Sequence, residues 1–378
     1  MEYGKLRVIV SGGGTGGHIF PAVSIADKLR ELNPGSEILF VGAEGKMEME
    51  KVPAAGYRIV GLPIVGLQRQ LNLKNIINDL KLPFKLIGSL RKAGKIIKEF
   101  KPDVVVGVGG YASAPLLYMA QRLHYPTLIQ EQNGFAGLAN KLLAKKADSI
   151  CVAYEDMDRF FPKDKIVLSG NPIRPVMNSS LGSRREEACG FYSMDSSKKH
   201  ILVIGGSLGS RTLNNAMKAW IEAGCPGGEG VEVLWQCGKY YKAEMDDFMK
   251  AHPCPGVRHT DFIARMDLAY ALADVVISRS GASSVSEICA IGKAAVFVPS
   301  PNVAEDHQTH NAMALVRKGA ALLVKDSEAS EKMLPSALAL CADDRKREQI
   351  EQGALSLAKT QASLTIADEV YRIAEKRK

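Results

Sequence analysis

Residues that could do chemistry gather near the start of the chain, in the stretch 11-SGGGTGGHIFP-21. Glycines let backbone N–H groups approach an anion, and the start of a helix adds the positive end of a dipole. An apolar run at 7–11 precedes the glycines, and apolar residues at helical spacing follow over 18–32. This order predicts a strand, a glycine-rich turn and a helix whose start carries His18.

His18 has two chemical interpretations. At a helix start the dipole favours the neutral imidazole, which can accept a proton as a general base. Alternatively, His18 is a first-turn residue that bonds its own loop or a phosphate of a ligand. Position alone leaves both open.

Three further loops rich in Gly and Ser follow apolar runs, namely 107-GVGGYASAP-115, 205-GGSLGS-210 and 278-SRSGASSVSE-287. Any one of the four loops could be a mere turn between a strand and a helix. Ligands of open α/β sheets bind at the carboxyl ends of strands, so the four together indicate one ligand crevice between two sheets. The carboxylate of Glu287 suits a ribose diol, or it is an early-helix acid that complements the dipole.

The first loop also fits the dinucleotide pattern G-x-G-x-x-G through Gly12, Gly14 and Gly17. That pattern needs an acid near the end of the second strand, where Glu44 is the only near candidate. An NAD(P)-dependent oxidoreductase is therefore the alternative from another enzyme class. No G-x-x-x-x-G-K-[ST] occurs, which disfavours a Walker-type nucleotidase.

The segment 299-PSPNVAEDHQTHNA-312 concentrates side chains that hydrogen-bond hydroxyl-rich ligands. His307 and His310 stand at i, i+3 with carboxylates beside them, but no third ligand has a clear spacing. We therefore expect no metal site there.

The whole chain alternates short apolar runs with helical patterns, which predicts an α/β protein with parallel sheets. The series restarts near residue 200, where HILVIGGSLGSRTLNNAMKAW repeats the order strand, glycine-rich turn, helix. We expect two Rossmann-like domains, 1–172 and 173–354, with a helix at about 355–378 that packs back on the first. The expected strands are 7–11, 37–42, 103–110, 127–131, 149–154, 165–170, 200–206, 231–238, 274–281 and 294–300.

Composition bounds the classes of function. The 378 residues carry a net charge of +8, which favours an anionic partner. The N-terminus runs straight into a strand, so we expect no signal peptide, and no apolar run reaches the ~20 residues of a membrane span. Seven scattered cysteines without a CxxC pair indicate reduced thiols in a cytoplasmic protein.

Seven segments in order, spanning nearly the whole chain, resemble the MurG family. They are GGTGGHIFPA (13–22), VGVGGYASAP (106–115), EQNGFAGLANK (131–141), GNPIR (170–174), GGSLGSR (205–211), SRSGASSVSEICAIGKAAVFVP (278–299) and HQTHNA (307–312). The resemblance implies a GT-B fold, two Rossmann-like doubly wound domains facing across a cleft. It implies an inverting transfer of N-acetylglucosamine from UDP-N-acetylglucosamine to the 4-hydroxyl of the muramoyl sugar of lipid I, which makes lipid II. It implies no obligatory metal or other cofactor.

The resemblance also assigns roles by position. Thr15, Gly16 and Gly17 should approach the transferred sugar and the diphosphate. Independently of the resemblance, Glu131 is a rival base to His18 or an orienting group, because it stands just before Gln132 and Asn133. The implied donor residues are Asn133 and Arg174 lining the cleft, Ser207 on a phosphate, and Ile263 on uracil through its backbone. Ala282, Ser283, Ser284, Val285, Ser286 and Glu287 should hold the diphosphate and ribose, and Gln308 with Asn311 should read the sugar hydroxyls. A third glycine before Thr15 departs from the family pattern, and so does PNVAEDH before Gln308.

A basic and aliphatic stretch, 71–101, suits an anionic membrane surface, although a solvated helix pair is the commoner outcome of such a pattern. A polyprenyl-pyrophosphate-linked acceptor favours the membrane, so we expect a peripheral protein at the cytoplasmic face, with the cell-wall synthesis machinery as a class of partner. Because the cations alternate with aliphatic rather than aromatic residues, we expect no nucleic-acid binding. The expected patch is Lys81, Phe84, Lys85, Ile87, Leu90, Arg91 and Lys92.

Overall fold

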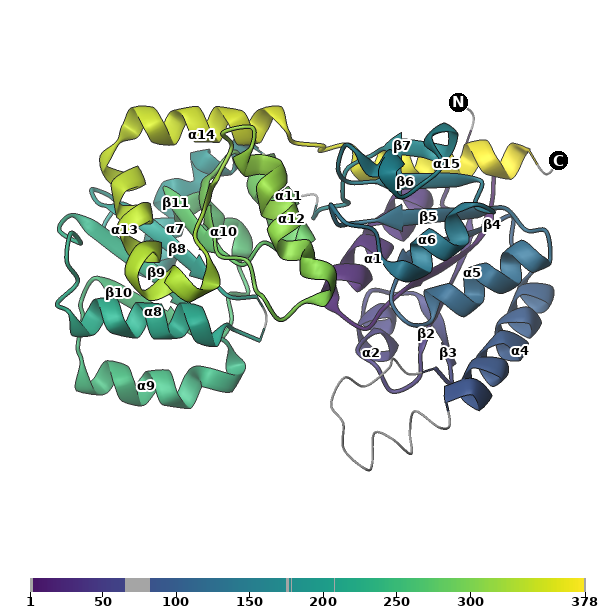
Figure 1. Cartoon of the computed structure of the whole chain (residues 1–378), viewed down its shortest axis with the longest axis horizontal. Helices are drawn as coiled ribbons and strands as arrows, with labels where there is room; N and C mark the ends of the chain where they lie inside the picture. Colours follow the sequence, from purple (N-terminus) through teal and green to yellow (C-terminus); the bar gives the residue numbers. More distant parts are fainter. Residues whose placement is uncertain (1–2, 65–81, 175–176, 178, 207, 377–378) are drawn as a thin grey trace. The chain divides into compact units, whose positions relative to one another are not determined.

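The computed structural model describes residues 3–64, 82–174, 177, 179–206 and 208–376. The chain divides into two compact units (Figure 1). The first unit is Met1–Ile173 together with Gln361–Lys378, and the second is Arg174–Thr360. The division falls one residue beyond the expected boundary at 172/173. Within the described residues, no helix is long and apolar enough to cross a membrane.

The first unit is built on a seven-stranded sheet in the order β3-β2-β1-β4-β5-β6-β7, and all its strand pairs are parallel. Its strands are β1 (Arg7–Gly12), β2 (Glu37–Ala43), β3 (Arg58–Leu62), β4 (Val104–Gly109), β5 (Thr127–Glu131), β6 (Ser149–Val152) and β7 (Ile166–Leu168). Its helices are α1 (Gly16–Leu32), α2 (Glu48–Ala54), α4 (Leu82–Phe100), α5 (Ser113–Arg122), α6 (Leu138–Ala144), α15 (Ala362–Glu375) and the 3-10 turns η1 (Met157–Arg159) and η2 (Lys163–Lys165).

The second unit repeats the plan with six parallel strands in the order β10-β9-β8-β11-β12-β13. Its strands are β8 (Lys199–Ile204), β9 (Val231–Gln236), β10 (Val257–Thr260), β11 (Val275–Ser278), β12 (Ala294–Phe297) and β13 (Leu322–Leu323). Its helices are α7 (Arg185–Tyr192), α8 (Arg211–Glu222), α9 (Lys242–Ala251), α10 (Met266–Leu272), α11 (Ala282–Ile291), α12 (His307–Val316), α13 (Ala329–Ala342), α14 (Asp344–Ser356) and the 3-10 turns η3 (Ser179–Arg184), η4 (Lys239–Tyr241), η5 (Ala304–Asp306) and η6 (Asp326–Glu328).

Each sheet reverses its strand order once, between β1 and β4 in the first unit and between β8 and β11 in the second. The second order is that of the Rossmann fold, and such reversals are where open α/β sheets bind ligands. The expected α/β class is therefore confirmed. All ten expected strands are present, with ends that differ by a few residues.

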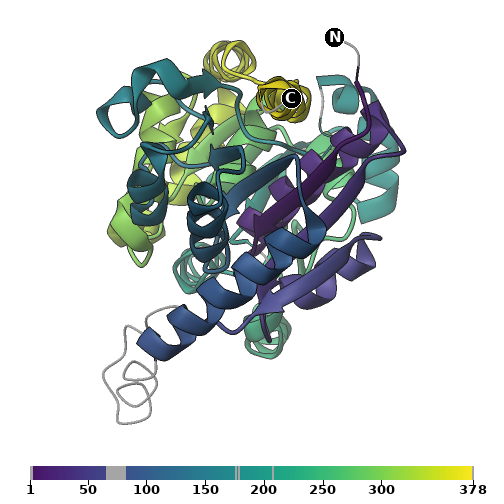
Figure 2. The ribbon, with the colours of Figure 1, turned by 90° about the vertical axis from the view of Figure 1, so that its right-hand side faces the viewer.

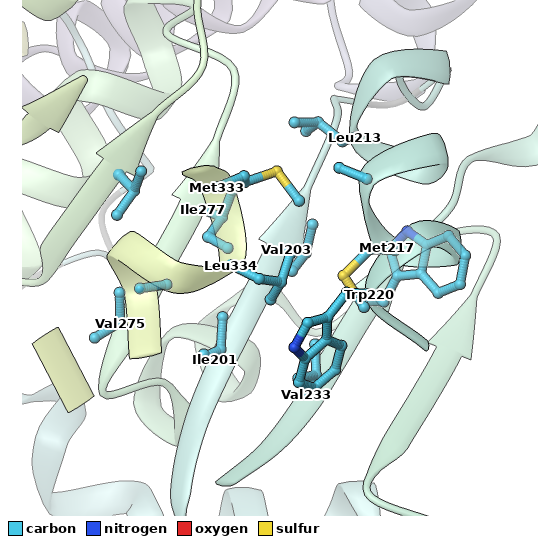
Figure 3. Packing of buried hydrophobic residues seen from close by; sticks show 14 of the residues in the cluster. Ile201, Val203, Leu213, Met217, Trp220, Val233, Val275, Ile277, Met333 and Leu334 are labelled. Atoms are coloured by element: carbon cyan, nitrogen blue, oxygen red, sulfur yellow. The ribbon is translucent and has the colours of Figure 1, made fainter. Parts of the chain in front are cut away.

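The central strands are apolar on both faces because helices cover both. In the second unit, side chains of β8, β9 and β11 meet those of α8 and α13 in one cluster (Figure 3). Val203, Ile277 and Met333 are fully buried there. Burying each such side chain stabilises the fold by roughly 1.5–3 kcal/mol. This packing fixes the strand ends from which the ligand loops start.

The chain ends back on the first unit. The expected single helix at 355–378 is interrupted, because α14 ends at Ser356 and α15 starts at Ala362. Figures 1 and 2 show α15, in yellow, against the first unit, where it packs on α1 and on the strands β4, β5 and β6. Its Ile366 and Val370 belong to the core of that unit, and Asp368 accepts a hydrogen bond from the Tyr3 hydroxyl at 2.8 Å.

Candidate active site

The loop between β1 and α1 presents the first-turn backbone and the His18 ring. α1 begins at Gly16 with Thr15 as its N-cap, so Gly16, Gly17 and His18 form the first turn. The His18 N–H donates to the Thr15 carbonyl at 3.1 Å, whereas the first N–H groups of a helix, here those of Gly16 and Gly17, lack acceptors within it. The His18 Nδ1 lies 3.0 Å from the carbonyl oxygen of Gly13. A carbonyl only accepts, so Nδ1 carries the hydrogen, and the neutral ring keeps its lone pair on Nε2.

Two glycines after β4 make room for this arrangement. A Cβ atom at Gly109 would lie 2.7 Å from the His18 ring, and one at Gly110 would lie 2.9 Å from the backbone nitrogen of Gly13. Both glycines also have a positive φ, 103° and 88°. The two strand ends are joined directly, since the Gly13 N–H donates to the Gly109 carbonyl at 3.3 Å. Glycine is therefore required at both positions for the ring to lie where it does.

A buried carboxylate braces the same loop from its other side. Glu48, the first residue of α2, is 1% exposed, and its side chain accepts the N–H of Gly14 at 2.9 Å and of Ala43 at 3.0 Å. A bound pyrophosphate would need the Gly14 N–H and would meet this negative charge. The expected partner acid, Glu44, instead bonds Lys92 on the surface at 2.8 Å. Both observations argue against the dinucleotide interpretation.

Glu131, at the end of β5, orients the next loop. It is 3% exposed, and its two oxygens accept from the backbone N–H of Asn133 and Gly137 and from the side-chain amides of Asn133 and Asn140, at 2.8–3.4 Å. Four donors occupy about all the acceptor positions of one carboxylate. The geometry thus favours the orienting role of Glu131 over that of a base.

In the second unit, Arg279 ties three loops together directly after β11. Its Nε donates to the Ser210 hydroxyl at 3.0 Å, and its Nη1 donates to the carbonyl of Val298 at 2.9 Å and pairs with Asp326. Ser210 is the N-cap of α8 and accepts the Leu213 N–H at 3.4 Å. Arg279 therefore holds the starts of α8 and α11 near each other at the point where the strand order reverses.

Glu287 forms a bidentate ion pair with Arg174, both N···O distances being 2.8 Å. The Tyr270 hydroxyl donates to the same carboxylate at 3.5 Å, and burial, with the charge of Glu287, raises the pKa of Tyr270 well above its ordinary value. Tyr270 thus stays a donor. A carboxylate has about four acceptor positions, so Glu287 keeps one for a ligand hydroxyl. It is the sixth residue of α11, so the alternative of a first-turn capping acid is wrong.

The first turn of α11 presents backbone N–H groups that a ligand of the second unit could use. Gly281 is its N-cap, and Ala282, Ser283 and Ser284 are half-exposed in the first turn. Ser286 is half-exposed, whereas Val285 is 1% exposed and lies in the core. Ile263 is also buried, at 3% exposure.

α12 is docked on the same loop. The Ser280 hydroxyl donates to the Gln308 carbonyl at 2.8 Å, and the Asn311 amide donates to the Ser280 carbonyl at 3.2 Å. The Gln308 Oε1 accepts the Ser300 N–H at 2.9 Å, so its Nε2 is the part that can donate to a ligand. Asn311 is fully buried and positions the loop.

Several expected residues need a separate remark. Ser207 and Lys81 lie outside the described residues, as does the side chain of Phe84. Thr15 is exposed and its hydroxyl lies 3.4 Å from His18 Nδ1. Among the residues that the structure describes, no three His, Cys, Asp or Glu side chains gather as a metal ion would need.

Two family models match the chain. The glycosyltransferase family 28 N-terminal domain matches residues 8–152, and the C-terminal domain of the same family matches residues 200–369. The chain belongs to glycosyltransferase family 28. Family 28 relatives include the UDP-N-acetylglucosamine–N-acetylmuramyl-(pentapeptide) pyrophosphoryl-undecaprenol N-acetylglucosamine transferases of Parabacteroides distasonis and Phocaeicola vulgatus. These are 52% and 51% identical over 99% and 98% of this chain, and 100% and 97% of theirs.

The crystal structure of Acinetobacter baumannii MurG has a similar fold, with a TM-score of 0.77 and 27% identity over 98% of this chain and 100% of that one. The resemblance to the MurG family and the expected GT-B class of two Rossmann-like units are thereby confirmed. The residues that sequence reasoning missed in this family 28 chain are Glu48, Arg279 and Tyr270. For Arg279, its place directly after β11 in the Ser-rich loop was the available signal.

The close approach of the His18 ring to Gly109 allows a direct test of whether the position of the ring matters for activity. Gly109→Ala should displace the His18 ring and lower the rate of glycosyl transfer more than tenfold. Gly45→Ala is the matched control, because Gly45 also has a positive φ, 69°, but a Cβ there meets nothing within 4 Å. The control should stay within about threefold of the parent, since it carries only the backbone strain. Equal rates for the two purified variants would contradict the role given to Gly109.

Proposed function

We propose that the chain transfers N-acetylglucosamine from UDP-N-acetylglucosamine to the 4-hydroxyl of the muramoyl sugar of polyprenyl-pyrophosphate-linked MurNAc-pentapeptide (lipid I), with inversion, which makes lipid II. One observation carries this proposal: relatives named for that reaction are about half identical to this chain over nearly its whole length. The first-turn amides of α1 and α11, each at a strand-order reversal, agree with it.

The second unit would bind the donor. First-turn N–H groups of Ala282 to Ser284 point along the helix dipole and suit the diphosphate, whose negative charge grows as UDP leaves. Glu287, held by Arg174, would accept a ribose hydroxyl with its remaining acceptor position. The Nε2 of Gln308 would donate to a sugar hydroxyl. These amides and side chains supply the charge stabilisation, so the proposal includes no obligatory metal.

The first unit would supply the base. The Nε2 of His18 accepts the proton of the acceptor hydroxyl while that oxygen attacks the anomeric carbon. The bond from that carbon to the UDP oxygen breaks on the opposite face, which inverts the configuration. The Gly13 carbonyl holds Nδ1–H throughout and so fixes the tautomer that can accept. Glu131 orients the loop that carries Asn133.

The helix α4 would bind the membrane surface in which the lipid-linked acceptor lies. Leu86 and Ile87 are 43% and 48% exposed near its start, and Arg91 follows Ile87 by one helical turn on the same face. Lys85, Leu90 and Lys92 are half-buried, and Lys92 is paired with Glu44. We infer that anionic lipid attracts Lys85 and Arg91 while the two apolar side chains enter the interface. We further propose that the protein is peripheral at the cytoplasmic face of the membrane, where its lipid-linked acceptor and the cell-wall synthesis machinery would be its partners.

Donor selectivity tests the proposed reaction. With a short-chain lipid I analogue, radiolabel from UDP-N-acetylglucosamine should appear in a lipid II product. UDP-glucose and UDP-N-acetylgalactosamine should react at least tenfold more slowly, because hydrogen-bonding groups of the site would be left unpaired. Equal rates would contradict this donor preference. The sequence also leaves open a sibling UDP-sugar transferase that acts on another lipid acceptor, which would leave the lipid I analogue unlabelled. No transfer, with NAD rather than UDP protecting the chain against heat, would support the oxidoreductase.

Charge reversal tests the membrane surface. Arg91→Glu should weaken binding to vesicles that contain anionic lipid several-fold, and added salt should weaken binding of the parent, because exposed charges are screened. Lys51→Glu, an equal change at an exposed residue of α2, serves as the control and should bind like the parent. Vesicle co-sedimentation measures both. Equal binding of the two variants would remove α4 from the membrane interface.

A further inference from the structure

Two cysteines meet at the edge of the second unit's sheet opposite the ligand loops. Cys225 lies in the turn between α8 and β9, and Cys254 in the turn between α9 and β10. Both turns lead into the amino ends of strands that pair directly in parallel, with Val257 opposite Val233. The strand pairing therefore brings the two turns together. The two Sγ atoms are 3.1 Å apart.

The backbone holds Cys225 in place. Its φ is 56°, a left-handed conformation that is uncommon for a residue with a side chain. Its N–H donates to the Trp220 carbonyl and its carbonyl accepts the Gly228 N–H, both at 3.0 Å, and the Trp220 indole N–H donates to the neighbouring Pro226 carbonyl at 3.1 Å. The turn is thus fixed with its thiol directed at Cys254, which stands between two prolines.

Access separates this pair from the other thiols. All seven cysteines are described; Cys225 and Cys254 are half-buried, and the other five are buried. A small oxidant can therefore reach this pair first. The sulfurs need to approach by only about 1 Å to reach the disulfide bond length of about 2.05 Å.

We propose that Cys225 and Cys254 are a site of reversible oxidative modification, at which a peroxide converts the two thiols into an intramolecular disulfide. One of the two thiols loses its proton and the thiolate attacks one peroxide oxygen. The O–O bond breaks, which gives a sulfenic acid and a hydroxide that takes up this proton as water. The other sulfur then attacks the sulfur of the sulfenic acid, the S–S bond forms, and the hydroxyl leaves with the proton of the second thiol as a second water. The two thiols lose two electrons and the peroxide gains them. Thiol reductants reverse the bond.

The surroundings of the pair supply the second thiol. Burial and the hydrogen bond to Cys254 raise the pKa of Cys225 to about 12. Whichever sulfur is oxidised first, the other lies 3.1 Å away and can attack the sulfenic acid. The bond would tie the end of α8 to the start of β10 across 29 positions of sequence. The disulfide would stabilise the second unit against unfolding. It would not contact the ligand loops, because these start at the opposite, carboxyl ends of the strands.

Intact mass after oxidation tests the proposal. The reduced full-length chain, treated with dilute hydrogen peroxide, should lose two hydrogens, and a non-reducing digest should yield one cross-linked peptide pair containing Cys225 and Cys254. Dithiothreitol should restore the starting mass. Cys225→Ser and Cys254→Ser should not lose the hydrogens, whereas Cys189→Ala, the control at a buried thiol, should behave like the parent.

Thermal unfolding provides a second readout. Oxidation should raise the Tm of the parent by about 5–10 °C, leave that of Cys225→Ser unchanged, and keep UDP affinity of the parent within twofold. Oxygen addition at either cysteine without cross-linking, a bridge to a third cysteine, or covalent dimers as the main product would each overturn the proposal.

Discussion

The contact between the carboxyl ends of β1 and β4 constrains everything around His18. Gly13 and Gly109 share a backbone hydrogen bond, and side chains at Gly109 or Gly110 would overlap the His18 ring or the Gly13 backbone. The ring therefore lies against bare backbone, with Nδ1 on the Gly13 carbonyl and the lone pair on Nε2. The glycines give the ring room, the Gly13 carbonyl favours the tautomer with its hydrogen on Nδ1, and the proposed proton transfer to Nε2 depends on that tautomer.

The two units use one backbone plan with different side-chain chemistry. In the first, the buried Glu48 occupies the Gly14 amide and leaves the helix start at Gly16 for a ligand. In the second, Arg279 gathers the loops and Arg174 holds Glu287. Donor binding needs positive charge near a diphosphate, and acceptor activation needs a base near a hydroxyl. The proposed roles of the two units therefore follow from the different side chains that each sheet places at its strand reversal.

The sequence predicts the central strands of both described sheets but only one of their four edge strands, β7. β1, β4 and β8 are near-continuous apolar runs because helices cover both faces, whereas the missed strands β3, β10 and β13 are edge strands with mixed or very short patterns. Missing β10 also hides the cysteine pair, since only its pairing with β9 brings those turns together.

The positions of some candidate residues follow from residue type and loop position, while their roles stay predictions. His18 and the start of α11 lie at helix N-termini as expected. The ion pair between Arg174 and Glu287 was not expected from the sequence. Glu48 could not be found, because GKMEMEK looks like a charged surface and burial of one of its acids depends on tertiary packing. The sequence also could not show that four hydrogen-bond donors fill the acceptor positions of the Glu131 carboxylate, because this depends on how the loop at 132–140 folds back.

The proposed base role of His18 depends on one measurement more than on any other, the separation of turnover from donor binding in His18→Ala. The account predicts that kcat falls by about 10²–10⁴, as expected for loss of a general base, while the Kd for UDP measured by calorimetry stays within twofold. An unchanged kcat in the purified variant would remove His18 from the mechanism. A fall in UDP affinity that accounts for the whole loss of activity would make it a ligand-binding residue instead.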